Sequence, residues 1–392
     1  MKFNIWKDCP KVPITELLSF IVDNRGKTVP TADDGWKLIA TNCVTNNTLF
    51  PVYEKVRYLT QETYETWFRA HPIPGDILFV NKGTPGRVCL VPDPVDFCIA
   101  QDMIALRADD EKIYNKYLFA VLRSREIQQQ IYNTNVGDVI PHFKKQFMDQ
   151  LLIPVPDRRI QEIIGNLYYE LSYKTELNKK INNNLSDLLQ AIYQKQFDDV
   201  SLGANQGILS DICSYSKEKV AVSELNVNTY FSTENMLPEK AGSTKATSLP
   251  TTPQTTACRN GDTLISNIRP YFKKIVYCED MCGCSTDVLC FTPVQAQYAA
   301  YLFSTLYTDK FFAFMVAGSK GTKMPRGDKQ QIMTYPVVLP AESELEEFNA
   351  IAFPVLEQLN SNKAENKRLS ALRDALLPKL MSGEIDISSI DL

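Results

Sequence analysis

The stretch NKKINNNLSDL runs from Asn178 to Leu188, and a related stretch, NKAENKRLSAL, runs from Asn362 to Leu372. Six of the eleven positions are identical, and the two stretches lie 184 residues apart. A mostly polar phrase that returns half a chain later indicates an internal repeat.

Other landmarks recur in the same order along the chain. They are YLF at 117 and 301, GDVIP at 137 with GTKMP at 321, Pro156 with Pro340, and GDILFV at 75 with GDTLIS at 261. All but the last pair keep the offset of 184, and the last has an offset of 186. One two-residue length difference between residues 80 and 117 reconciles the offsets. The sequence therefore predicts a tandem duplication.

Each copy divides into a mixed part and a helical part. Short apolar runs such as GDILFV, GRVCLV, DTLISNI and KKIVYC, set between Gly, Pro and Asn, predict strands, and 115–132 and 298–315 predict helices. The stretches 158–197 and 342–380 predict helices of about 60 Å. We expect an α+β protein with two mixed α/β domains, 1–153 and 204–338, and two long antiparallel helices in 154–203 and 339–392.

Apolar residues along both long stretches step alternately by four and three, which is the pattern of a coiled-coil seam. Both seams are apolar at their ends and polar in the middle. Pro354 is expected to kink or loosen the second helix. The residues predicted to form the helix-pair interface are Ile164, Leu167, Leu171, Asn178, Ile181, Leu185, Leu188, Ile351, Val355, Asn362, Leu369, Leu372 and Leu376.

A long helix with one apolar stripe must bury that stripe, and the helix of the other copy is the natural partner. An antiparallel pair would bring the polar middles together, with Asn178 near Asn362, where buried Asn side chains fix register at some cost in stability. The alternative is two unrelated surface helices. The matching position of the polar gap in both copies favours pairing.

Composition limits the possible functions. Residues 337–392 contain 5 basic and 10 acidic residues, so the net charge of −4 comes mainly from this segment. Residues 1–336 are nearly balanced in charge and can still carry a basic surface stripe. We find no apolar run long enough for a membrane span and no signal-peptide pattern in the first ten residues. The ten cysteines therefore suggest reduced thiols and a cytoplasmic protein. The spacing of Cys278, Cys282, Cys284 and Cys290 matches no usual zinc pattern, so no metal is expected.

Catalytic patterns are absent from the sequence. There is no phosphate-binding loop, no nucleophile elbow, no HExxH motif and no methyltransferase tetrad. Adjacent acidic pairs such as Asp109 and Asp110 are interpreted as turn or cap residues. A non-catalytic binding protein without a cofactor is expected.

Cationic loops at equivalent places in the two copies favour nucleic acid as the ligand, because Gly lets the backbone approach and Lys or Arg suits phosphates. They lie in DNRGKTVP, NKGTPGR and IPHFKK of the first copy, and in NIRPYFKK and SKGTKMPR of the second. The candidate DNA-binding residues are Arg25, Lys27, Lys82, Thr84, Arg87, His142, Lys144, Asn267, Arg269, Lys273, Lys274, Lys320, Lys323 and Arg326.

These motifs resemble those of the specificity subunit of type I restriction-modification systems. The resemblance rests on GDILFVNKGTPGRV, GDTLISNIRPYFKK, IPHFKKQFMDQLLIPVPD before a long helix, GTKMPRGDKQQIMTYPVVLP and LRDALLPKLMSGEID, in that order. It implies two target-recognition domains, each reading one half of a bipartite double-stranded DNA sequence. It further implies helices that space these domains and dock two methyltransferase subunits, which restriction subunits join.

Two alternatives from other classes remain. One is a non-catalytic coiled-coil scaffold for protein partners, which would lack salt-sensitive DNA binding. The other is the recognition part of an enzyme with its own methyltransferase, which would require motifs that these 392 residues lack.

Overall fold

The computed structural model describes residues 4–24, 26, 28–134, 141–198 and 205–386. The chain divides into two units, Met1–Lys180 with Lys363–Leu392 (unit 1) and Ile181–Asn362 (unit 2). Our predicted domain boundaries lie at the ends of the long helices, whereas each unit includes one part of both helices. The boundaries 1–153, 154–203, 204–338 and 339–392 therefore remain a description of the sequence repeat.

Unit 1 contains three small sheets. Their orders are β1-β9, β2-β8-β5-β6 and β4-β3-β7, and every pair is antiparallel except β3 with β7. The strands are β1 (Lys11–Pro13), β2 (Leu18–Val22), β3 (Trp36–Ile39), β4 (Arg57–Leu59), β5 (Ile77–Val80), β6 (Val88–Leu90), β7 (Phe97–Ile99), β8 (Met103–Ala108) and β9 (Leu152–Pro154).

Unit 2 repeats this plan. Its sheets are β10-β19, β11-β18-β15-β16 and β12-β14-β17-β13, with β13 and β17 parallel. The strands are β10 (Gln206–Ile208), β11 (Cys213–Tyr215), β12 (Lys219–Ala221), β13 (Tyr230–Phe231), β14 (Gln254–Cys258), β15 (Thr263–Ser266), β16 (Ile275–Tyr277), β17 (Cys282–Cys284), β18 (Val288–Pro293) and β19 (Pro336–Val338). The expected α+β fold and tandem repeat are thus confirmed.

The helices repeat as well. Ser124 and Thr308, which are 184 residues apart, each cap a helix by accepting the backbone N–H three residues on. The helices are α1 (Ile5–Asp8), α2 (Gln61–Thr66), α3 (Asn115–Leu122), α4 (Arg125–Asn133), α5 (Arg158–Tyr193), α6 (Leu209–Ile212), α7 (Ala299–Leu306), α8 (Asp309–Ala317), α9 (Lys329–Ile332) and α10 (Glu342–Met381).

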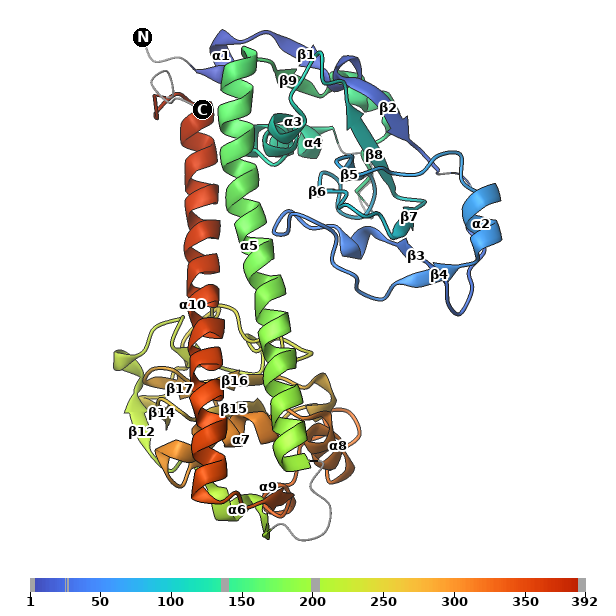
Figure 1. The fold of residues 1–392 in the computed structure, drawn as a ribbon. Coiled ribbons are helices and arrows are strands. Elements are labelled where there is room, and N and C mark those ends of the chain that lie inside the picture. The colour runs from blue at the N-terminus through green and yellow to red at the C-terminus, as the bar shows by residue number, and fades with distance from the viewer. Residues whose placement is uncertain (1–3, 25, 27, 135–140, 199–204, 387–392) are drawn as a thin grey trace. The chain divides into compact units, whose positions relative to one another are not determined.

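The repeated YLF motif lies at the centre of each main core. In unit 1, α3 packs beside α5 (Figure 1), and the fully buried Tyr117 donates its hydroxyl to the Pro154 carbonyl of β9 at 2.8 Å. In unit 2, Tyr301 of α7 donates to the Val338 carbonyl of β19 at 2.5 Å. The motif recurs because each copy uses a buried tyrosine, worth about 1.5–3 kcal/mol in apolar burial, to join its helix to a two-stranded sheet.

Gly165 is the one glycine in the first long helix because α3 passes very close to it. A Cβ atom at this position would lie 2.6 Å from the Tyr117 backbone nitrogen. Only a residue without a side chain permits that approach.

Parts of α5 and α10 run side by side in opposite directions within each unit (Figure 1). Both helices are close to their predicted lengths, and α10 stays helical through Pro354. The predicted seam positions differ in burial. Ile164, Asn178, Val355 and Asn362 are buried, and Leu167, Leu171, Leu185, Leu369 and Leu376 are half-buried.

The other predicted interface positions are exposed to solvent. Ile181, Leu188, Ile351 and Leu372 are 36 %, 50 %, 43 % and 47 % exposed. The residue that follows each of them is more buried in every case: these are Asn182, Leu189, Ala352 and Arg373. Alternate seam positions therefore lie one residue later than predicted. One residue rotates a helix position by about 100°, so an error of one residue exchanges the buried side for the solvent side.

The polar middles pair differently from the expectation as well. In unit 1, Asn178 Nδ2 donates to Asn366 Oδ1 at 3.0 Å and to Glu365 at 2.6 Å. In unit 2, Asn362 Nδ2 donates to Asn182 Oδ1 at 2.8 Å. Asn178 therefore bonds to Asn366 and not to Asn362. The two Asn–Asn bonds are equivalent under the 184-residue repeat, because 178 matches 362 and 182 matches 366.

Candidate nucleic-acid interface

Two segments that the sequence analysis singled out separately meet in unit 1. Lys82, just after β5, forms an isolated antiparallel bridge with His142. The Gly83 N–H donates to the Pro141 carbonyl at 3.0 Å, and the Phe143 N–H donates to the Asn81 carbonyl at 2.7 Å. We call this arrangement, residues 81–87 with 141–144, the loop junction of unit 1.

Unit 2 builds the same junction from residues 267–274 and 320–327. Ile268 bridges Arg326, the Arg269 N–H donates to the Pro325 carbonyl at 2.7 Å, and the Gly327 N–H donates to the Asn267 carbonyl at 3.2 Å. These are the bonds of unit 1 at the repeat offsets of 186 and 184. The duplication therefore preserves a precise backbone arrangement, while the side chains on it differ.

Each junction contains one buried asparagine, Asn81 in unit 1 and Asn267 in unit 2. Asn81 and Asn267 are 0 % and 6 % exposed, and their backbone N–H groups donate to Asp102 and Asp287 at 2.8 Å. The prediction that Asn267 contacts DNA does not agree with this burial. The Asn267 side chain is polar but buried, and its backbone bonds to both Asp287 and Gly327, so it holds the two segments of the junction together.

The loop 320–326 of unit 2 carries three exposed cations, and two of them have acidic partners. Lys320 lies 2.6 Å from Asp328, and Arg326 lies 3.3 Å from Asp287. The hydrogen bond to Asp328 raises the pKa of Lys320, and the same contact lowers the pKa of Asp328. Lys323 is exposed, and its carbonyl accepts from the Arg269 guanidinium at 3.5 Å. The structure therefore gathers Arg269, Lys320, Lys323 and Arg326 on one surface.

Lys273 and Lys274 are more committed to the fold of unit 2. Lys273 lies 3.1 Å from Asp309, which also binds Lys240 at 2.7 Å. Lys274 donates to the Thr233 carbonyl at 2.5 Å, and burial lowers the pKa of its amine. These lysines hold the loop in place, and less of their charge faces solvent.

The junction of unit 1 is less cationic. Lys82 lies 3.9 Å from Asp102, Arg87 and Lys144 are exposed, and Thr84 and His142 are half-buried. The candidates Arg25 and Lys27 lie outside the described residues.

Sequence reasoning missed the acids that hold these cations. Asp102 and Asp287 lie at the start of β8 and β18, and Asp328 caps α9 with its side chain. Asp102 and Asp287 face a cation in the junction of their own unit, Lys82 and Arg326. The near-equivalent positions of Asp102 and Asp287 in the two copies could have drawn attention to these acids.

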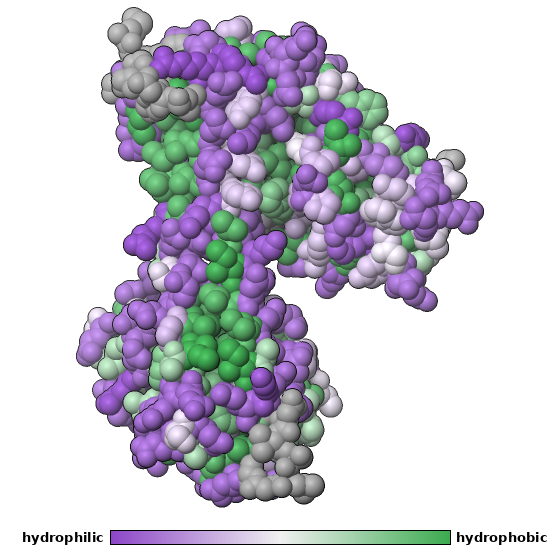
Figure 2. Space-filling view, viewed as in Figure 1, coloured by the Kyte–Doolittle hydropathy of each residue, from purple (hydrophilic) through white to green (hydrophobic). Residues whose placement is uncertain are grey.

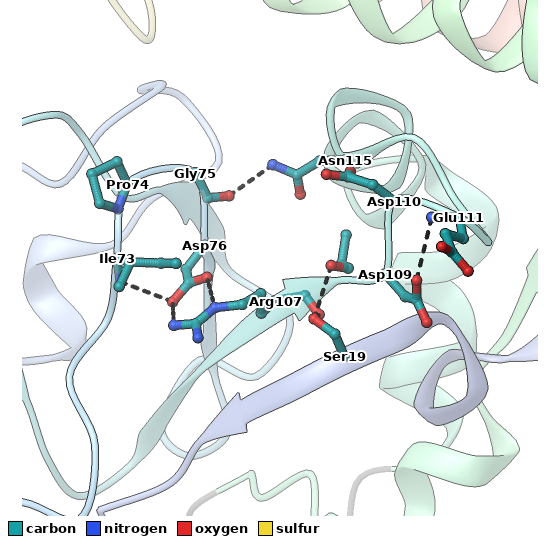
Figure 3. A pocket seen from close by; sticks show the side chains of 11 residues that line it. Ser19, Ile73, Pro74, Gly75, Asp76, Arg107, Asp109, Asp110, Glu111 and Asn115 are labelled. Atoms are coloured by element: carbon teal, nitrogen blue, oxygen red, sulfur yellow. Dashed lines mark hydrogen bonds and ion pairs between the residues drawn. The ribbon is translucent and has the colours of Figure 1, made fainter.

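A pocket of about 470 Å³ in unit 1 is a different kind of site (Figure 3). Asp76 binds Arg107 through two bonds of 2.9 Å, while Asp109, Asp110 and Glu111 line the other side. The Asp109 carboxylate accepts the Glu111 N–H in a turn and lies 2.9 Å from Lys112. The pocket is predominantly acidic and its guanidinium is already paired, so it does not suit a phosphate.

Five buried cysteines form most of a small core between two sheets of unit 2. Cys258, Cys278, Cys282, Cys284 and Cys290 pack with Met236, Leu264 and Val288. The Sγ atoms of Cys278 and Cys282 are 3.6 Å apart, and all ten cysteines of the chain are free thiols. Within the described part of the chain, no group of three or more metal-ligating side chains is placed to hold a metal ion. Nor does any helix in these ranges have the length and apolarity to cross a membrane.

Together, the mixed domains, their long helices and the loop junctions define a duplicated α+β protein with one loop junction in each copy. Comparison with known proteins shows what part of the chain is similar to. Residues 13–187 match the type I restriction modification DNA specificity domain. The chain thus carries a stretch similar to the type I restriction-modification specificity domain, in agreement with the resemblance seen in its motifs.

The relatives are distant. Over 76 residues the chain is 30 % identical to the MjaIX specificity subunit of Methanocaldococcus jannaschii, and over 153 residues it is 25 % identical to the HindI specificity subunit of Haemophilus influenzae. These matches span 19 % and 38 % of this chain, but only 18 % and 33 % of the relatives. The S subunit from M. genitalium shares the fold, with a TM-score of 0.56, 17 % identity and coverage of 97 % of this chain and 98 % of that one. The names of the two relatives describe specificity subunits, in agreement with the expected non-catalytic class.

Proposed function

We propose that this chain is the DNA-specificity subunit of a type I restriction-modification complex. Its two globular parts each read one half of a bipartite double-stranded target. The observation that carries the proposal is the loop junction, which recurs bond for bond in both copies while its side chains differ. The same backbone arrangement with different side chains suits two domains that recognise different DNA half-sites.

Methyl transfer and cleavage are assigned to partner subunits, and the chain itself needs no cofactor. The long helices are the proposed docking surface for two methyltransferase subunits, and restriction subunits join that complex. In support, the helices of unit 2 expose Leu188, Ile351 and Phe353, and Figure 2 shows an apolar area over these helices. Such exposed apolar areas are typical of protein interfaces. We place the assembly in the cytoplasm, where its DNA lies.

Methylome sequencing tests the proposal directly. Cells would express this chain with its cognate methyltransferase subunit, and a second culture would express a chimera that carries residues 1–153 of a relative. A bipartite methylated motif is expected, and the chimera should change only one half of it. A change in both halves would contradict the division of labour. If no methylation appears and the purified chain shows no salt-sensitive DNA binding, the scaffold alternative is supported instead.

A charge-removal experiment tests the junction. Lys320, Lys323 and Arg326 would be changed to Ala together, and DNA affinity would be measured at several salt concentrations. Each lost phosphate contact should reduce the slope of log K against log salt by about 0.9. The exposed pair Lys367 and Arg368 on α10 provides a control in which cations are also removed. An unchanged slope in the triple variant would remove this loop from the interface.

A further inference from the structure

The turn between β15 and β16 has an unusual backbone. Residues Pro270–Phe272 form one 3-10 turn, and the residues on both sides of it, Arg269 and Lys273, have positive φ angles of 52° and 51°. A left-handed conformation costs a residue with a side chain about 1–2 kcal/mol. In unit 1 the position that matches Arg269 is Gly83, which adopts its φ of 85° without this cost.

Several bonds hold the turn in this conformation. The Phe272 and Lys273 carbonyls accept the backbone N–H groups of Glu239 and Lys240 at 2.8 and 2.9 Å. The Lys273 amine binds Asp309 at 3.1 Å, and the Arg269 N–H binds the neighbouring loop through the Pro325 carbonyl. Backbone strain that is fixed in this way is concentrated at functional sites.

The fixed turn presents two aromatic rings to solvent. Tyr271 and Phe272 are 46 % and 36 % exposed, with ring centroids 4.7 Å apart. Met324, on the segment that hydrogen-bonds to Arg269, is 47 % exposed. We call Tyr271 and Phe272 the aromatic tip. The matching residues of unit 1 are Pro85 and Gly86, so the tip belongs to one copy only.

Cations lie on the same two segments as this apolar tip. Arg269, Lys320, Lys323 and Arg326 lie on the two segments of the junction, and the Lys274 amine lies 5.9 Å from the centre of the Phe272 ring. Cations suit the phosphates of a duplex, and a rigid apolar group among them suits a base step.

We propose that the aromatic tip inserts between base pairs and partly unstacks one step of the DNA half-site read by unit 2. The inference rests on the proposed function. The half-site read by unit 1 stays stacked at the matching place, because Pro85 and Gly86 offer no ring. Sequence preference at that step then depends on how easily the step opens, in addition to hydrogen bonds with its base edges.

The test uses the full chain assembled with its methyltransferase subunits and duplexes that carry the motif found by methylome sequencing. Single mismatches are moved through both halves, and the affinity for each duplex is measured. A mismatch at the wedged step removes the unstacking cost, so the wild-type complex should bind it about tenfold or more tightly than the intact duplex. Tyr271→Ala with Phe272→Ala should lose this preference and bind the intact duplex more weakly. Tyr271→Phe should keep it.

Other outcomes separate the possible failures. Tyr132→Ala, which removes an exposed ring of unit 1 outside the loop junction, serves as the control and should leave the mismatch profile unchanged. A preference that survives in the double alanine variant overturns the inference but leaves the proposed function intact. Loss of subunit assembly with an unchanged mismatch profile also overturns it, because the tip then contacts protein. No binding of the motif by the wild-type complex would instead reject the proposed function.

Discussion

The asparagine pairs of the two long helices give a prediction whose sign depends on which residues are partners. In unit 1, Asn178 bonds to Asn366, and in unit 2, Asn362 bonds to Asn182. Changing Asn178 and Asn366 together to Leu removes both members of one pair. Changing Asn178 and Asn362 removes one member from each pair. The side-chain oxygens of Asn366 and Asn182 then lose their asparagine donors, while their amide groups still donate to the Thr175 and Leu359 carbonyls.

The expected energies follow from this pairing. A buried polar group that loses its partner costs about 1–3 kcal/mol, whereas replacing both partners by apolar groups is close to neutral or stabilising. The Asn178→Leu variant should therefore lose about 1–3 kcal/mol, and the Asn178→Leu/Asn366→Leu variant should recover most of it. Asn178→Leu/Asn362→Leu should lose about twice the single cost. From sequence alone this last change is expected to stabilise the helices, and the structure reverses that sign.

Urea unfolding followed by circular dichroism measures these free energies, and hydrogen exchange of 163–180 reports the local change where the units unfold separately. Asn183→Leu, at an exposed position of α5, controls for the added apolar side chain. A coupling energy of about 1 kcal/mol or more between Asn178 and Asn366 is expected from the double-mutant cycle. Strictly additive losses for that pair would refute the reasoning.

Three other changes test separate features. Gly165→Ala places a Cβ atom 2.6 Å from the Tyr117 nitrogen, and thermal melting should show a loss of about 1–3 kcal/mol. Lys323→Ala alone should lower the salt slope of DNA binding by about 0.9, measured by fluorescence anisotropy. Lys240 lowers the pKa of Asp309, so the stability from this carboxylate is present above its usual pKa and is lost as pH falls through the lowered value. Asp309→Asn should therefore flatten the acid side of the stability profile, while an unchanged profile would contradict this role.

Much of the fold could be predicted because the repeated motifs mark equivalent strands and helices in both copies. The strands at 77–80 and 263–266 and the helix pairs that begin at Asn115 and Ala299 lie where the repeated motifs placed them. The seam of the long helices was misplaced at alternate positions. Polar and apolar residues are mixed there. Hydrophobicity alone favours Ile181 over the half-buried Asn182, and it does not distinguish Leu188 from the buried Leu189.

The candidate site was predicted in outline. The sequence matched Lys82 with its counterpart loop in the second copy, yet it could not show that Lys82 meets His142, since these residues are 60 positions apart in the chain. The sequence also did not predict that Asn267 is buried. An asparagine among cations suggests recognition, whereas the structure buries its side chain to 6 % exposure with Gly327 close to it.

The five buried cysteines in the core of unit 2 allow the opening rate of this core to be measured by thiol labelling. Cys258, Cys278, Cys282, Cys284 and Cys290 are at most 4 % exposed, so a thiol reagent reaches them only after the two sheets around them part. The rate of labelling therefore reports how often this core opens, and mass spectrometry identifies which thiols reacted. Slower labelling in the presence of DNA would measure, without any engineered probe, how firmly the bound target holds unit 2 closed.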